Sequence, residues 1–292
     1  MKNSREPAKP RKEDGEVDSS SELRAFASSR EQKLSTARHI AREILVFDEI
    51  GSTNDETARL ARAGAESGLA VFAERQTAGR GRFARRWESA ARKGLWFSLL
   101  LRPELPLTDW PRLATWAAVG IARGLEEALP SCCASIKWPN DVYLLGRKAS
   151  GILIETAVGE NSFAVVGIGV NVNHAREDFP EELADKAISL RGAAGADAPD
   201  FDRQLVAAAL LRNLDALYPA LVGDFSPVIA EAESRSLLLG QWIEVAGAAE
   251  PIQGVVEGLE PDGSLRLRGA EGQVQVVSGG EVTVSKWDRD IG

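Results

Sequence analysis

The residues best suited to chemistry lie in the loop 76–87, which reads Gln-Thr-Ala-Gly-Arg-Gly-Arg-Phe-Ala-Arg-Arg-Trp. Its glycines let backbone N–H groups approach a ligand closely, and arginine side chains bind phosphate oxygens in pairs. The loop therefore favours an anionic ligand, and a phosphorylated one in particular. Taken alone, it is equally consistent with a solvated basic loop, or with an RNA-binding segment in which Phe83 and Trp87 alternate with positive charge.

A second candidate consists of two short stretches, Lys-Trp-Pro-Asn-Asp at 137–141 and Arg-Lys-Ala-Ser-Gly-Ile-Leu at 147–153. The first predicts a rigid turn at a strand edge that holds the carboxylate of Asp141 and the carboxamide of Asn140 in place. Lys148 begins an otherwise apolar strand, where an inward-facing ammonium is costly unless it meets an anion. In isolation, a solvent-facing Lys148 and a purely structural Asp141 would be the favoured interpretation.

These residues need elements that position them, and the apolar patterns predict an α+β fold. We expect strands over 44–47, 69–74, 95–101, 134–137, 142–145, 151–157 and 163–172, and helices over 52–64, 109–129 and 202–221, with a further helix ending near residue 235. Within 202–221, Leu205, Ala208, Ala209, Leu211 and Leu214 recur at helical spacing. Residues 192–200 predict a flexible loop, and the short strands and glycine turns of 237–287 suit a small SH3-like β domain.

Composition limits the function classes. The 292 residues suggest two domains, at roughly 150 residues each. Lys and Arg number 35 against 43 Asp and Glu, and the net charge of −8 removes a general attraction to nucleic acid or anionic membranes. Apolar runs such as 99–101 are far shorter than the ~20 residues that span a bilayer. The beginning of the chain also lacks the apolar core of a signal peptide, so we expect a cytoplasmic protein without a membrane partner.

The cysteines and histidines do not predict a metal site. Cys132 and Cys133 are adjacent, and His39 and His174 lack the spacing of metal ligands. We therefore expect buried or half-buried reduced thiols, and no metal bound by the chain itself.

The order of these motifs along the chain is more informative than any one motif alone. In sequence they are Ser52-Thr53-Asn54, Gln76 with Gly79-Arg80-Gly81-Arg82 and Trp87, the stretches 137–141 and 147–153, and the glycine-rich strand 167–173. In this order and spacing the chain closely resembles the bacterial biotin–protein ligases, also called biotin–[acetyl-CoA-carboxylase] ligases, over about residues 44–287. The resemblance implies a mixed-sheet catalytic domain of the biotin/lipoate ligase type over 41–236 and an SH3-like β-barrel domain over 237–292. The polar segment 1–40 is expected to be a mostly disordered tail.

The resemblance also implies a reaction in two halves. The carboxylate of biotin attacks the α-phosphorus of ATP, with Mg²⁺ present, and yields biotinyl-5′-AMP and pyrophosphate. The ε-amine of one lysine on a biotin carboxyl carrier protein of acetyl-CoA carboxylase then attacks the mixed anhydride and releases AMP. The implied ligands are therefore biotin and ATP with Mg²⁺, and the implied partner is the carrier protein.

Site residues follow from the family motifs, position by position. The resemblance assigns catalytic roles to four residues: Lys148, Arg80, Arg82 and Asp141. It assigns biotin binding to Ser52, Thr53, Asn54, Gln76, Arg80, Gly81, Arg82 and Lys148. It assigns nucleotide binding to Arg82, Trp87, Asn140, Asp141, Lys148 and Asn171.

Family members that repress transcription carry a winged helix-turn-helix of roughly 60 residues, and the segment before Ile44 has too few apolar residues for one. We therefore expect no repressor activity and no specific DNA partner, with the chain a monomer or weak homodimer. A lipoate–protein ligase or octanoyltransferase shares the catalytic fold and is the second enzyme hypothesis. A nucleic-acid-binding protein that uses the arginine loop is the third, and the net charge of −8 argues against it.

Overall fold

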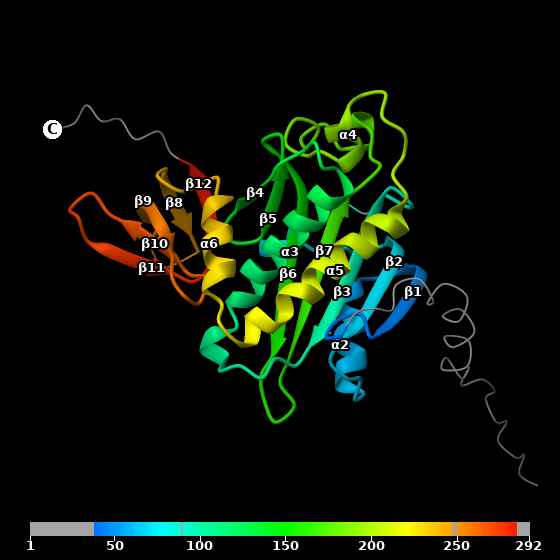
Figure 1. Cartoon of the computed structure of the whole chain (residues 1–292), viewed down its shortest axis with the longest axis horizontal. Coiled ribbons are helices and arrows are strands. Elements are labelled where there is room, and N and C mark those ends of the chain that lie inside the picture. Colours follow the sequence, from blue (N-terminus) through cyan, green and yellow to red (C-terminus); the bar gives the residue numbers. More distant parts are fainter. Residues whose placement is uncertain (1–37, 89, 248–249, 285–292) are drawn as a thin grey trace, which may run out of the picture.

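Two β-sheets organise the computed structural model, which describes residues 38–88, 90–247 and 250–284 (Figure 1). The larger sheet contains, in spatial order, β1 (Glu43–Ile50), β2 (Leu69–Gln76), β3 (Gly94–Leu101), β7 (Phe163–Asn171), β6 (Arg147–Ala157), β5 (Asp141–Leu144) and β4 (Ala134–Lys137). The pair β1–β2 is parallel, and every other neighbouring pair is antiparallel. The predicted mixed sheet is therefore present, with β1 and β4 at its edges.

Helices cover the larger sheet on opposite faces. The helices are α2 (Thr53–Arg62), α3 (Arg112–Ala128), α4 (Leu190–Ala194), α5 (Arg203–Val222) and α6 (Ser226–Ser234). Alternate residues of a strand point to opposite faces, so Leu99 joins the large core with α3 and α5, while Leu100 joins a smaller cluster beneath α2. The face beneath α2 carries the candidate site.

Among the described helices, α5 alone is long and apolar enough to cross a membrane by length and composition. Its apolar residues Leu210 and Leu214 are instead fully buried against the core. Trp116 of α3 fixes this packing, because its indole N–H donates to the carbonyl oxygen of Leu214 at 3.2 Å. In this structure α5 is a core helix.

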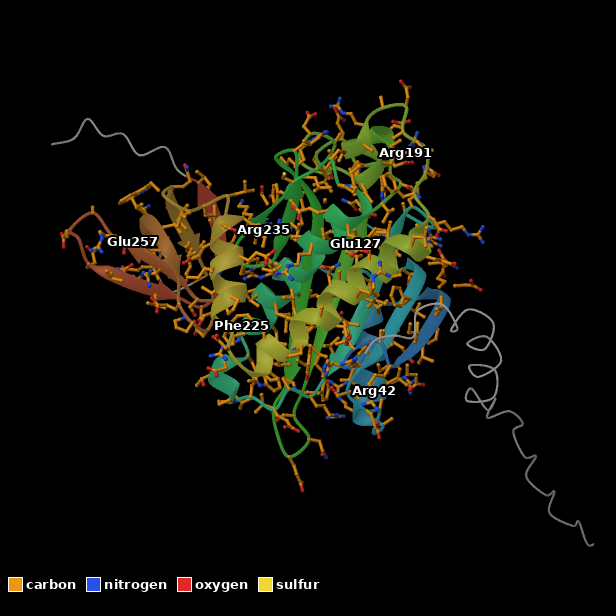
Figure 2. All side chains as sticks on the ribbon, in the orientation of Figure 1. Arg42, Glu127, Arg191, Phe225, Arg235 and Glu257 are labelled. Carbon is orange, nitrogen blue, oxygen red and sulfur yellow. The ribbon has the colours of Figure 1, made fainter. Side chains whose placement is uncertain are left out.

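The second sheet is antiparallel and has five strands in the order β11 (Val274–Val277), β10 (Leu265–Arg268), β9 (Ile252–Leu259), β8 (Trp242–Ala246) and β12 (Glu281–Val284). Helix α6 lies between the two sheets, with Phe225 and Arg235 at its opposite ends (Figure 2). Trp138, just after β4, belongs to the core of the second sheet, and its indole N–H donates to Gly263 O at 2.9 Å. The predicted α+β class with a small C-terminal β domain is confirmed.

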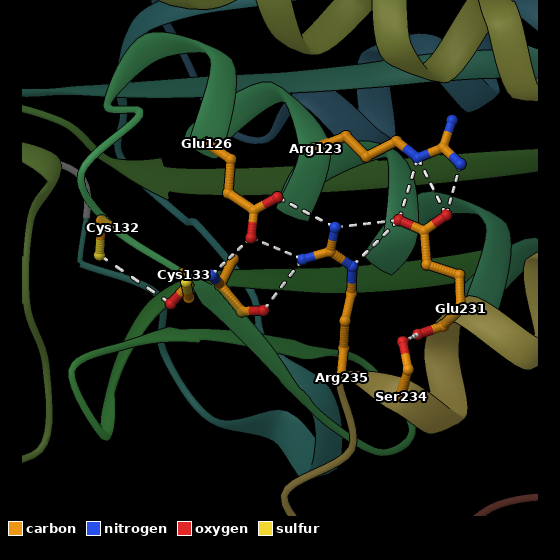
Figure 3. Close-up of polar contacts among 8 residues, drawn as sticks. Arg123, Glu126, Cys132, Cys133, Glu231, Ser234 and Arg235 are labelled. Carbon is orange, nitrogen blue, oxygen red and sulfur yellow. Dashed lines mark hydrogen bonds and ion pairs between the residues drawn. The ribbon is translucent and has the colours of Figure 1, made fainter.

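Arg235 connects α6 to the larger sheet through a cluster of charged side chains (Figure 3). Its guanidinium donates to both carboxylate oxygens of Glu126 on α3, at 2.6 and 2.9 Å, and to Glu231 on α6 at 3.0 Å. A further bond reaches the carbonyl oxygen of Ala134 on β4 at 3.2 Å. The hydrogen bond with Glu126 raises the pKa of Arg235, so the guanidinium stays charged at the junction.

The structure corrects several details of the sequence analysis. Ile40, assigned to the tail, is fully buried, and the backbone N–H groups of residues 38–40 donate to Asp215. Residues 192–194 belong to α4 rather than to a loop. Leu205 is 70% exposed because the buried stripe of α5 runs through Val206 and its neighbours, one residue further along. Cys133 is exposed, whereas Cys132 is buried.

Candidate active site

A cavity of about 380 Å³ opens on the α2 face of the larger sheet, at the start of α2. Its walls come from α2, the loop after β2, the β4–β5 turn, β6, β7, residues 178–187 and the C-terminal sheet. The residues that the sequence analysis assigned to the site all line this one cavity: Ser52, Thr53, Asn54, Gln76, Arg80, Gly81, Arg82, Trp87, Asn140, Asp141, Lys148 and Asn171.

Three glycines of the central strands form the floor of the cavity. Gly169 lies between Trp96 and Gly151 in the sheet, and Gly167 lies in the next row. A methyl group on Gly167 would come within 2.1 Å of the Asn54 side-chain oxygen, and one on Gly169 within 2.5 Å of the Trp87 ring. The hollow therefore exists because these positions have no side chains.

Trp87 rests on this floor. Its ring meets Trp96 edge to face, with 6.2 Å between centroids, and the ammonium of Lys148 lies 5.3 Å from its centroid. The indole N–H is buried and has no hydrogen-bond partner among the described residues. Because a buried donor is normally paired, this N–H is available to a ligand in the cavity.

The loop that carries Trp87 folds back on itself. The N–H of Trp87 donates to Gly79 O at 3.0 Å, and that of Gly81 donates to Arg85 O at 2.7 Å. Phe83 at its tip has φ 56°, a left-handed conformation that is uncommon for a residue with a side chain. The loop thus forms a small closed unit over the cavity.

Arg82 joins this loop to both domains. Its guanidinium donates to the Asn140 side-chain oxygen and to Gly280 O, each at 3.1 Å. Burial lowers the pKa of Arg82, and the negative charges of Asp141 and Glu281 partly offset that effect. Glu281 also pairs with Arg85. The C-terminal sheet therefore contributes to the site, which the sequence analysis did not foresee.

Lys148 and Asp141 form an ion pair inside the cavity, with 2.6 Å between Nζ and the carboxylate. Asn140 holds the neighbouring turn, because its side-chain N–H donates to Ile152 O at 2.7 Å and its carbonyl accepts from Ile152 N at 2.9 Å. The inward-facing Lys148 thus meets an anion of its own chain. Nearby, burial and then the charge of Asp141 raise the pKa of Tyr143 to about 12, so its hydroxyl stays protonated.

Polar groups gather at the start of α2. The Gln76 side-chain oxygen accepts from the N–H of Thr53 at 2.8 Å and lies 3.1 Å from the Thr53 hydroxyl. The Ser98 hydroxyl, fully buried on β3, lies 2.7 Å from the Thr53 oxygen and 2.6 Å from the Asn54 side-chain oxygen. No pattern in the sequence singles out Ser98, because it lies inside an otherwise apolar strand.

Arg80 lines the cavity, and its guanidinium pairs with acidic side chains of the same chain. Its guanidinium contacts two carboxylates of the chain, Asp55 at 2.9 Å and Glu155 at 2.9 and 3.0 Å. Although burial opposes the charged form, these hydrogen bonds raise the pKa of Arg80. Arg80 is thus engaged by acidic side chains at the entrance.

Asn171 and His174 close the far end of the cavity. Asn171 is 6% exposed, and its side-chain N–H donates to Ile188 O at 3.3 Å. His174 stacks on Phe179 with 5.1 Å between centroids, and burial lowers its pKa to about 4. His174 is neutral at pH 7, and no cluster of three metal-ligating side chains occurs in the described part of the chain.

Two protein-family models match this chain, one over the larger sheet and one over the C-terminal sheet. Residues 46–173 match the Biotin/lipoate A/B protein ligase family, and residues 238–285 match the Biotin protein ligase C terminal domain. These matches define a ligase with a catalytic sheet and a C-terminal β domain.

Individual relatives indicate which kind of ligase this chain resembles. The bifunctional ligase/repressor BirA of Bacillus subtilis is 36% identical over 242 residues, which cover 82% of this chain and 73% of that protein. The biotin--[acetyl-CoA-carboxylase] ligase of Mycobacterium tuberculosis is 34% identical over 246 residues, covering 82% of this chain and 88% of the relative. The biotin protein ligase of Aquifex aeolicus, solved with biotin and ATP, superposes with a TM-score of 0.70 at 31% identity, covering 84% of this chain and 99% of that one. The chain belongs to the biotin protein ligase family.

Proposed function

We propose that this chain activates biotin with ATP to biotinyl-5′-AMP and transfers the biotinyl group to one lysine of the biotin carboxyl carrier protein of acetyl-CoA carboxylase. The observation that carries this proposal is that a polar cluster around Thr53 and the cations Arg82 and Lys148 line the same cavity. The name of the Mycobacterium tuberculosis relative and the ligands of the Aquifex aeolicus structure support the same acceptor class and substrates.

In the first half-reaction, two anions must be brought together. Arg82 and Lys148 reduce the repulsion between the carboxylate of biotin and the phosphates of ATP, and their charge stabilises the negative charge that develops on the α-phosphoryl oxygens. Asp141 holds Lys148 through the ion pair of 2.6 Å. The Trp87 ring and the loop then shield the adenylate from water.

The Mg²⁺ of this reaction fits as the nucleotide's own ion. Among the described residues no three His, Cys, Asp or Glu side chains cluster as a metal site. Mg²⁺ commonly keeps several waters and binds one or two carboxylates together with substrate phosphates. Asp141 is the carboxylate of the predicted set that would contribute, and the ion would neutralise phosphate charge.

In the second half-reaction, the amine of the carrier lysine attacks the carbonyl carbon of the mixed anhydride, and AMP leaves. The carrier lysine must enter through the cavity mouth, which is bordered by the loop 76–87 and by Gly280 and Glu281. The ion pair between Arg85 and Glu281 spans this border. We propose that this border is where the carrier lysine enters.

ATP–pyrophosphate exchange tests the first half-reaction. Purified protein with Mg²⁺ would receive biotin, lipoate or octanoate in parallel. We expect exchange with biotin alone, because the hydroxyl and amide groups around Thr53 match the donors and acceptors of a ureido ring. Exchange with lipoate or octanoate would instead support the second enzyme hypothesis, and no exchange with any acid would contradict the proposed activity.

The remaining expectations form part of the proposal. We expect a cytoplasmic monomer or weak homodimer that has no repressor activity. Residues 1–37, on which the last expectation depends, lie outside the described residues. Sedimentation with and without biotin and ATP would measure the assembly, and a gel-shift titration with promoter DNA would reveal sequence-specific binding if the chain were a repressor.

A further inference from the structure

Glu155 of β6 contacts two residues that line the cavity, Asn54 and Arg80. One carboxylate oxygen accepts from the Asn54 side-chain N–H at 2.7 Å, and both accept from Arg80 at 2.9 and 3.0 Å. Glu155 pairs with Val165 in the sheet, and its side chain faces α2, where it contacts Asn54. Neither the sequence motifs nor the proposed reaction gives it a role.

The Asn54 side chain lines the cavity but is almost fully buried. It is 4% exposed, Gly167 lies directly beneath it, and its oxygen lies 2.6 Å from the Ser98 hydroxyl. A carboxamide can be turned over, which exchanges its donor and acceptor ends. An ionised carboxylate only accepts, so Glu155 keeps the nitrogen of Asn54 towards itself at 2.7 Å and the oxygen towards Ser98. The carbonyl oxygen of Leu153 accepts from the same nitrogen over a longer distance of 3.4 Å and favours the same orientation.

The orientation of Asn54 determines where the proton of the Ser98 hydroxyl points. A hydroxyl has a single proton to donate, and the Asn54 oxygen can only accept, so the proton of Ser98 goes to Asn54. Ser98 therefore cannot also donate to Thr53, whose oxygen is 2.7 Å away. The Thr53 hydroxyl donates to the Gln76 oxygen at 3.1 Å, which turns its proton away from the cavity.

Thr53 lines the cavity, and with its proton turned towards Gln76 its oxygen presents a lone pair to a ligand. A lone pair at that position accepts from an N–H, such as one of a cyclic urea. With Asn54 turned over, the proton of Ser98 would be free to reach Thr53. The hydrogen bonds that link Asn54, Ser98 and Thr53 could then run in either direction.

We infer that Glu155 is a positioning residue for biotin recognition: by fixing Asn54, it sets the hydrogen-bond polarity that Ser98 and Thr53 present to the ureido ring. This inference rests on the proposed function, because it takes a cyclic urea as the ligand. The ion pair with Arg80 is a smaller part of the effect, since Glu155 and Arg80 have side chains 44% and 39% exposed and surface ion pairs contribute little.

The chain offers a matched pair of variants. Glu155→Gln keeps the shape of the side chain, but its carboxamide can meet Asn54 with either end. Only the longer contact of 3.4 Å with the Leu153 carbonyl then favours one orientation of Asn54. Asp55→Asn also removes one carboxylate from Arg80 but has no hydrogen bond to Asn54. A role through Arg80 predicts similar effects from the two variants, whereas a role through Asn54 predicts an effect from Glu155→Gln alone.

The measurement is the KM for biotin and the kcat of ATP–pyrophosphate exchange, together with the biotin Kd from calorimetry without ATP. For Glu155→Gln we expect KM and Kd to rise about tenfold or more, as for the loss of a hydrogen bond to a charged group. The kcat should stay within about threefold, since this site binds biotin away from the reacting carboxylate. Asp55→Asn should keep both constants within about twofold, as for an exposed ion pair.

A stability measurement guards against simple misfolding. Urea unfolding followed by circular dichroism should show Glu155→Gln folded under assay conditions, so that a change in biotin affinity is a change in recognition. Equal effects of Glu155→Gln and Asp55→Asn, or an unchanged biotin affinity in folded Glu155→Gln, would overturn the inference while wild-type exchange leaves the proposed function intact. A wild-type chain without biotin-dependent exchange would contradict both.

Discussion

The glycine floor makes a sharp prediction about Gly169. A methyl group there would lie 2.5 Å from Cε2 of Trp87 and 2.7 Å from Cζ2 and Nε1. These atoms belong to a rigid ring rather than to the flexible end of a side chain. In Gly169→Ala, the ring of Trp87 must therefore leave the floor, or β7 must move beneath it.

The size of the effect follows from the contact. Inserting a methyl group into a well-packed site typically costs about 1–3 kcal/mol. Without Trp87 the clash disappears, and what remains is the gain of about 0.4–1 kcal/mol from the stiffer unfolded chain. We therefore expect Gly169→Ala to destabilise the wild-type protein and to be neutral or stabilising in a Trp87→Ala background.

Urea unfolding followed by circular dichroism measures the free energy of unfolding of the wild type, Gly169→Ala, Trp87→Ala and the double variant, which together form a double-mutant cycle. The coupling free energy between the two positions should be at least about 1 kcal/mol, as found for residues in direct contact. Gly159→Ala is the matched control, because nothing lies within 4 Å of a methyl group there. Its effect should stay within about 0.5 kcal/mol.

An equal loss of stability from Gly169→Ala in both backgrounds would refute this reasoning. The cost would then arise in the backbone of β7 and not in contact with the indole. The glycine floor would then be a feature of the sheet alone, and the position of the Trp87 ring would not depend on it.

Three further predictions concern Lys148, Arg82 and His174. By comparison with the loss of an oxyanion donor, Lys148→Ala should raise the barrier to adenylate formation by about 2.7–4 kcal/mol. Arg82→Gly should instead release free biotinyl-AMP, because the loop loses its bonds to Asn140 and Gly280; small, equal effects in single-turnover assays would contradict this division. The pKa of His174 is about 4 in the folded protein, below its ordinary 6.5, so the unfolded chain binds more protons between these values. The contribution of His174 to the free energy of unfolding is complete above pH 6.5 and falls by about 3 kcal/mol towards pH 4. Urea unfolding of His174→Phe at several pH values should lack this part of the pH dependence. If the free energy of unfolding depends on pH as in the wild type, His174 is not its source.

Local patterns predicted much of the fold and the main motifs. The strands and long helices occur where apolar residues alternate or recur at helical spacing, because those periods follow from backbone geometry. The stripe on α5 was displaced by one residue at Leu205, since several neighbouring positions are apolar and burial against α3 selects among them. The phase of a uniformly apolar helix is decided by tertiary packing.

The site was predicted where ligand-binding residues are close together in sequence, as in the loop 76–87. Glu281 lines the cavity, and Ser98 and Glu155 contact Asn54, which lines it. These three residues were missed because contacts distant along the chain bring each of them to its place. Ser98 lies opposite Gly167 across two antiparallel strands, and Glu281 arrives with the second sheet. Strand register and domain closure leave no local pattern, so these residues could be found only from the three-dimensional structure.

The cluster around Arg235 affects how the molecule unfolds. Arg235 binds α3, β4 and α6 at once, and the next residues continue the connection, since Leu237 N donates to Ile136 O at 2.9 Å. The second sheet therefore begins from a point fixed on the first, and Trp138 extends from the first into the core of the second. Neither sheet can lose its packing without disturbing the other, so thermal unfolding should be a single cooperative transition that both domains share.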